Sequence, residues 1–171
     1  MERKIVIRHR RGCKLLTFIL AGMVFVSIAA PAFGQSKDPL IGTWVLDLGK
    51  STFMPDNPPQ KRTLIFAAKD NGIRCVIRTV TNGGLDNGMT GESEFTAKYD
   101  GKDYDISESL LDTISLKKID ANTIERTGKI RGKAVETATM KLGQDGKVLT
   151  VTTKGEINGT GYGSTQVYAR Q

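Results

Sequence analysis

The sequence predicts an all-β protein: a single up-and-down antiparallel β-barrel of about eight to ten strands that follows an N-terminal signal peptide. Turn-forming dipeptides, in which Asn or Asp precedes Gly, recur at short intervals and are typical of hairpins. They are Asn71-Gly72, Asn82-Gly83, Asn87-Gly88, Asp100-Gly101, Asp145-Gly146 and Asn158-Gly159. Between them lie alternating runs rich in β-branched residues, and no stretch after residue 35 has sustained helical periodicity.

The N-terminal segment has the layout of a secretory signal peptide. Residues 1–14 are basic, residues 15–30 are almost wholly apolar, and small residues then surround Pro31. We expect cleavage after Gly34, a periplasmic or extracellular location in a bacterium, and no stable membrane insertion of the mature chain. The alternative is an uncleaved anchor, because the stretch 15–33 is just long enough to span a bilayer.

The charge of the chain belongs largely to this segment. Of 25 Lys and Arg and 18 Asp and Glu, six basic residues and one acidic residue lie in residues 1–34, so 19 and 17 remain in residues 35–171. A nearly neutral chain lacks the excess of cations with which proteins bind nucleic acid. The single histidine, His9, also lies in the segment, which excludes His-dependent catalytic units and zinc sites from the mature domain. We therefore expect no metal, no cofactor and no catalysis.

Ten strands are expected in residues 35–171, which form one domain. They lie near 41–47, 61–68, 72–81, 88–98, 103–109, 112–119, 122–130, 133–142, 147–154 and 163–170. In the third, Ile73, Cys75 and Ile77 share one face while Arg74 and Arg78 share the other, which is the pattern of a half-buried strand.

Two connections interrupt the rhythm of tight turns. Residues 48–60 contain three prolines and predict a loop that covers one end of the barrel, and residues 155–163 predict a flexible connection. Closing the meander removes exposed strand edges, and a barrel of this size has room for one small ligand. An open sandwich is the alternative architecture.

Motifs at both ends of the domain resemble those of a known group. The segment Leu40–Leu46 contains Gly42-Thr43-Trp44, which resembles the first-strand G-x-W signature of the calycins, the group of lipocalins and fatty-acid-binding proteins. The segment Thr165–Arg170 resembles the last strand of intracellular lipid-binding proteins. The chain is also similar to small exported lipocalin-like proteins of bacteria.

The resemblance implies a set of ligand-binding residues. In the family, a Tyr and an Arg of the last strand bind a ligand carboxylate, and Tyr168 matches that Tyr while Gln166 stands in place of the Arg. This departure favours a neutral or weakly polar apolar ligand. Too few residues separate the first two strands for the helical lid of fatty-acid-binding proteins.

Three further residues complete the candidate site. Arg78 and Arg126 are candidate interior partners of a carboxylate, although most strand arginines face solvent. Trp44 would join Gln166 and Tyr168 in the pocket if the barrel closes; the alternative, implied by lipocalins, is that it stacks on Arg170 at the closed end.

Other candidate groups have simpler interpretations. Glu92 and Glu94 point to the same side of a strand, as paired catalytic carboxylates do, and equally fit a solvated face. The turn around Asp100, Asp103 and Asp105 has oxygen ligands for calcium but not the spacing of a specific loop. Cys75 fits a buried apolar position better than a reactive thiol.

These observations lead to one expected function and two alternatives. We expect an exported, monomeric, lipocalin-like protein that holds a small apolar molecule inside its barrel. A barrel with a filled core that acts through its surface, as an envelope or partner-binding protein, is the main alternative. An enzyme such as an isomerase that uses Glu92, Glu94 and Tyr168 is the third.

Overall fold

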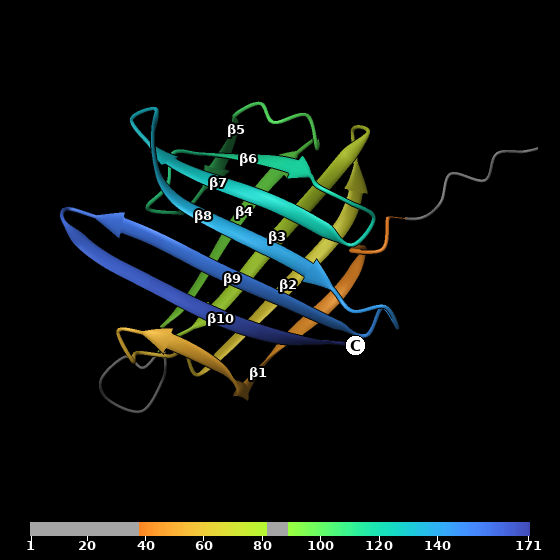
Figure 1. Cartoon of the computed structure of the whole chain (residues 1–171), viewed down its shortest axis with the longest axis horizontal. Coiled ribbons are helices and arrows are strands. Elements are labelled where there is room, and N and C mark those ends of the chain that lie inside the picture. The colour runs from red at the N-terminus through yellow and green to blue at the C-terminus, as the bar shows by residue number, and fades with distance from the viewer. Residues whose placement is uncertain (1–37, 82–88) are drawn as a thin grey trace, which may run out of the picture. The chain divides into compact units, whose positions relative to one another are not determined.

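A computed structural model describes residues 38–81 and 89–171, which form a closed barrel of ten antiparallel strands (Figure 1). The strands are β1 Gly42–Met54, β2 Lys61–Lys69, β3 Gly72–Val80, β4 Thr90–Ala97, β5 Tyr104–Ser107, β6 Thr113–Lys118, β7 Thr123–Ile130, β8 Lys133–Leu142, β9 Val148–Ile157 and β10 Thr160–Arg170. The predicted all-β, up-and-down barrel is confirmed. The expected signal peptide, His9 and the turns at Asn82-Gly83 and Asn87-Gly88 lie outside the described residues.

The first and last strands close the barrel. Each strand pairs with its neighbours in the sequence, and β1 pairs with both β2 and β10, where Trp44 is opposite Leu64 and Arg170. None of the ten described strands is left with an open edge, which rules out the alternative of an open sandwich. The architecture is consistent with a calycin-like fold.

Strand β1 is longer than the sequence indicated, because part of the expected loop 48–60 belongs to it. The strand continues to Met54 through an irregularity between Asp47 and Thr52. There the Ser51 hydroxyl donates to the Asp47 carbonyl at 2.6 Å and accepts from the Val167 amide at 3.0 Å. A side chain thus satisfies backbone groups that the interrupted ladder leaves over, and the connection shrinks to residues 55–60.

The expected flexible connection at residues 155–163 is also wrong. Strand β9 extends to Ile157 and β10 begins at Thr160, so only Asn158 and Gly159 connect them. Both have positive φ, 53° and 78°, as a two-residue hairpin turn requires. Asn-Gly correctly marked a turn, but the Gly- and Thr-rich residues around it belong to the strands, because they pair with one another as far as Ile157 and Thr160.

The side chains that alternate inward form a continuous apolar core. It includes Trp44, Phe66, Ile114, Leu116 and Leu149, which are almost wholly buried. Among residues 38–81 and 89–171, no helix is long and apolar enough to cross a membrane.

Candidate functional site

One end of the barrel is closed by Trp44 and Arg170. The Arg170 guanidinium lies 4.2 Å from the centroid of the Trp44 ring and donates to the carbonyls of Ile41, Pro39 and Gly146. The Trp44 indole donates to the Leu40 carbonyl at 2.8 Å, and its side chain is fully buried. Trp44 therefore plugs the closed end, as the alternative interpretation predicted, and does not line the cavity described below.

Steric constraints at this end explain why the first residue of the G-x-W motif is glycine. Gly42 has a φ of 144°, where residues with a side chain are strained, and a Cβ there would lie 2.8 Å from Arg170 Nη1. In this motif, Trp44 provides the ring on which Arg170 stacks, and Gly42 leaves room for the Arg170 guanidinium beside the backbone.

Above this plug lies a small cavity of about 70 Å³ inside the barrel. Its apolar walls come from β2, β3, β4, β8 and β9. They are formed by Leu64, Phe66, Cys75, Phe95, Met140 and Val151. Burial raises the pKa of the Cys75 thiol to about 12, so this residue behaves as a small apolar wall group, as expected.

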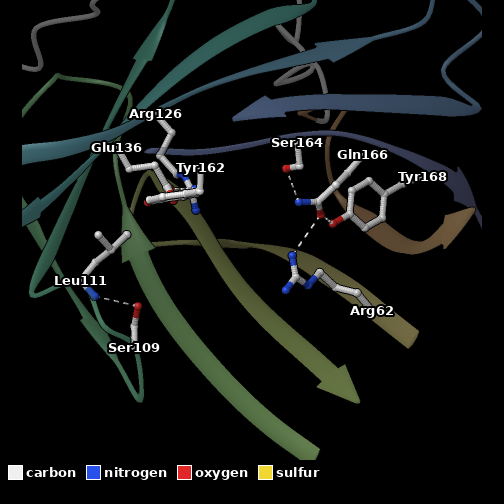
Figure 2. A network of polar contacts seen from close by, with 9 residues as sticks. All are labelled: Arg62, Ser109, Leu111, Arg126, Glu136, Tyr162, Ser164, Gln166 and Tyr168. Carbon is white, nitrogen blue, oxygen red and sulfur yellow. Dashed lines mark hydrogen bonds and ion pairs between the residues drawn. The ribbon is translucent and has the colours of Figure 1, made fainter. Parts of the chain in front are cut away.

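A first polar cluster consists of Arg62, Thr79, Ser164, Gln166 and Tyr168, of which Arg62, Gln166 and Tyr168 line this cavity. Figure 2 shows all of them except Thr79. Gln166 Oε1 accepts from Arg62 Nη1 at 3.1 Å and from the Tyr168 hydroxyl at 2.5 Å, while Gln166 Nε2 donates to Ser164 at 2.8 Å. Arg62 Nε donates to Thr79 at 3.1 Å. Burial raises the pKa of Tyr168 to about 12, although the charge of Arg62 acts in the opposite direction, so its hydroxyl remains a donor. Below we refer to these five residues as the inner cluster.

A second polar cluster, consisting of Arg126, Glu136 and Tyr162, lies closer to the open end (Figure 2). One carboxylate oxygen of Glu136 pairs with Arg126, and the other accepts from the Tyr162 hydroxyl at 2.8 Å. Burial, followed by the hydrogen bond to Glu136, raises the pKa of Tyr162 above its usual range. We call these three residues the mouth cluster.

The clusters separate the small cavity from two wider, open cavities. These have volumes of about 490 Å³ and 360 Å³, and both are lined in part by Arg62, Arg126, Glu136 and Tyr162. Because Arg62 and Arg126 line all three cavities, they lie at the boundary between the apolar interior and the mouth.

The loop between β5 and β6 narrows the mouth. Leu111, whose amide donates to Ser109, is 8% exposed and lies over Gly128, where a Cβ would come 2.6 Å from its Cδ1 atom. The adjacent Leu110 is 81% exposed and lines the larger open cavity.

Of the five candidate residues, the structure brings three together. Gln166, Tyr168 and Arg126 line the small cavity, whereas Trp44 lies beneath it and Arg78 lies on the outer face. Arg78 pairs there with Glu92 at 2.6 Å, with both side chains about half exposed. The alternation of β3 places Cys75 and Ile77 inside, and Arg78 is one step out of phase with them.

The remaining acidic candidates are engaged in surface contacts. Glu94 accepts from Arg74 through both oxygens at 2.5 Å, which holds the pKa of Glu94 below its usual range. Asp100 accepts from Tyr104, and Asp103 pairs with Lys129. Within the described part of the chain, no group of three or more acidic, Cys or His residues has the arrangement of a metal site.

Arg62, Glu136 and Tyr162 were not among the residues predicted from the sequence. For Arg62 and Glu136 a signal was present, because residues two apart on a strand share a face. Arg62 alternates with Leu64 and Phe66, and Glu136 alternates with Ala138 and Met140, all of which are buried. Charged residues in phase with a buried face are the pattern that marks an interior polar site.

No protein-family model matches this chain, and a search of curated proteins found no match.

Proposed function

We propose that this protein is an exported, calycin-like binding protein that holds a small molecule in the open half of its barrel. The observation that carries the proposal is the asymmetry of the interior. The barrel is plugged at one end by Trp44 and Arg170, and two polar clusters lie between a small apolar cavity and a wider mouth at the other end.

This arrangement has the features of a ligand site. Apolar walls favour binding by desolvation, and a few polar groups placed at one level fix the orientation of a ligand. The hydrogen bonds of Gln166 to Arg62, Tyr168 and Ser164 hold the inner cluster in one geometry before any ligand arrives. The G-x-W motif and its stacking on Arg170 support assignment to the calycins, and the layout of residues 1–34 supports export.

Native mass spectrometry of the protein purified from its own cells, followed by solvent extraction, tests the proposal. We expect a chain that begins at Gln35 and carries a stoichiometric small-molecule adduct. Val151→Phe, which fills the small cavity, should remove the adduct, whereas Val167→Phe on the outer face should keep it.

An opposite result has a defined meaning. A folded protein that carries no adduct, even after incubation with an extract of its own cells, would contradict the binding proposal. It would favour the alternative of a filled barrel that acts through its surface.

A further inference from the structure

We propose that the ligand carries one negative charge and that Arg62 neutralises it at the boundary between the small cavity and the mouth. This inference rests on the proposed function, because it specifies the chemistry of a molecule bound in the same site. It departs from the expectation of a neutral ligand, and the reason lies in the charges that face the interior.

The charges that line the three cavities do not balance. They belong to Arg62, Arg126 and Glu136. Both oxygens of the Glu136 carboxylate are already used, one by Arg126 and the other by the hydroxyl of Tyr162. The lining therefore retains one uncompensated positive charge, on Arg62.

Arg62 has only neutral partners within the described part of the chain. Its Nε donates to the Thr79 hydroxyl and its Nη1 to the Gln166 carbonyl, each at 3.1 Å, and none of the ion pairs between described residues includes it. These two contacts orient the guanidinium, and Nη2 makes no hydrogen bond to a described residue. Arg62 is therefore an oriented cation whose remaining N–H donors are available to a ligand.

In the structure Gln166 positions Arg62, whereas its place in the sequence suggested direct contact with a neutral ligand. It stands where the family's carboxylate-binding Arg would be, and this favoured a neutral ligand. The structure places Arg62 of β2 beside Gln166, whose Oε1 accepts a hydrogen bond from Arg62 Nη1. Because Gln166 Oε1 also accepts from Tyr168, the two residues of the last strand position the cation (Figure 2).

The positive charge of Arg62 makes binding depend on the charge of the ligand. Arg62 is partly buried and lines both open cavities, so a ligand that fills the mouth would remove solvation that neutral hydrogen-bond acceptors replace only in part. A bound anion compensates this loss through charge-assisted hydrogen bonds, which are roughly twice as strong as neutral ones. A neutral ligand that covers the mouth would desolvate Arg62 further without compensating it.

The volume of the cavity limits the apolar part of the ligand. A cavity of about 150 Å³ holds a benzene molecule, and the space beneath Arg62 is about 70 Å³. Only a short or compact group of a few carbons therefore fits inside, and anything larger extends into the mouth beside Leu110. The ligand class is a compact organic anion, with a carboxylate as the simplest example.

Matched pairs of carboxylates and amides provide the test. Butyrate and butyramide, and the corresponding pairs from two to eight carbons, would be titrated at constant ionic strength and neutral pH by calorimetry and NMR. The full chain is used after removal of bound molecules. We expect short carboxylates to bind at least about ten-fold more tightly than their amides. Arg62→Gln should abolish this preference.

Arg78→Gln is the matched control, because it removes the same charge from the outer face and should leave the preference unchanged. A second measurement uses the parent protein, so it does not depend on whether a variant folds. The Nε–H resonance of Arg62 should shift when the carboxylate is added and stay in place when the amide is added.

The outcomes separate this inference from the proposed function. If amides bind as tightly as carboxylates, or if Arg62→Gln keeps the preference, the protein binds small molecules but the anion assignment is wrong. If neither series binds and the purified protein carries no adduct, the proposed function fails and the inference fails with it.

Discussion

At the scale of single residues, the interior polar side chains form hydrogen-bond networks in which one side chain contacts several partners. The Gln166 amide joins Arg62, Tyr168 and Ser164, and Arg170 joins Trp44 to three backbone carbonyls. All buried side-chain polar atoms of the described residues have a hydrogen-bond partner, which is what a low-dielectric interior requires. A substitution in such a network therefore also affects the partners that it leaves behind.

Arg170→Met tests this at the closed end. Methionine keeps an unbranched chain but loses the donors to three carbonyls and the contact with the Trp44 ring, so we expect the free energy of unfolding to fall by about 2–4 kcal/mol. Urea denaturation gives the value. Arg78→Met, which removes a solvent-exposed ion pair, should cost less than about 1 kcal/mol. Equal losses in the two variants would contradict the assigned role of Arg170.

The candidate site could be predicted only in part at this scale. The family motif pointed to Gln166 and Tyr168, and the structure places both at the cavity. The partner of Gln166 comes from β2, and a sequence separation of 104 leaves no local signal of the contact between Arg62 and Gln166. Arg78 was offered as an interior residue although the alternation of its strand had already put it on the face opposite Cys75 and Ile77, and the structure agrees with the alternation.

At the scale of strands, local turn chemistry determines how many elements form, while pairing partners determine how long they are. The turn dipeptides fall in five of the nine connections between strands, because Asn, Asp and Gly adopt the required backbone conformation without help from distant residues. The alternating runs between them indicated the remaining strands. The extensions of β1 to Met54 and of β9 and β10 toward their turn depend on ladders with neighbouring strands. Composition alone therefore made these segments resemble loops.

Glycine inside a strand gives a prediction at this scale. Gly155 on β9 lies opposite Tyr162 on β10, and a Cβ at position 155 would come within 3.0 Å of three atoms of the Tyr162 side chain. Gly155→Ala should displace that ring, break its hydrogen bond to Glu136 and lower the free energy of unfolding by about 1–3 kcal/mol.

Gly161→Ala is the control on the neighbouring strand, because the nearest atom to its new Cβ would be 3.9 Å away. Denaturation curves and the NMR signals of the Tyr162 ring would report the difference. If the two variants were equally stable, Tyr162 could move away from β9 at little cost, and the close contact with Gly155 would not hold the ring in place.

At the scale of the whole molecule, the buried ionisable groups make stability depend on alkaline pH. Burial raises the pKa of Cys75 and of Tyr168 to about 12 in the folded protein, from ordinary values of 9.0 and 10.0. Between these values the unfolded chain releases protons that the folded chain keeps, so rising pH favours unfolding. Stability is complete below about pH 9 and falls as the pH approaches 12.

Tyr168→Phe isolates one part of this effect. Between about pH 9 and about pH 11, the parent should lose about 1 kcal/mol more stability than the variant, because phenylalanine has no proton to release. Urea denaturation at the two pH values measures both losses. Parallel losses would mean that the Tyr168 hydroxyl does not keep its proton in the folded barrel.

Because β1 pairs with β10, the barrel can close only after the whole domain has been synthesised. Arg170 contacts the carbonyl of Ile41 at a sequence separation of 129, so the first strand to leave the ribosome has no partner on this side until the last strand emerges. A chain that stops before the final 11-residue strand would leave both β1 and β9 with unsatisfied edges. Loss of the C-terminus should therefore cause self-association of the product, because each open edge is a template for a strand of another molecule.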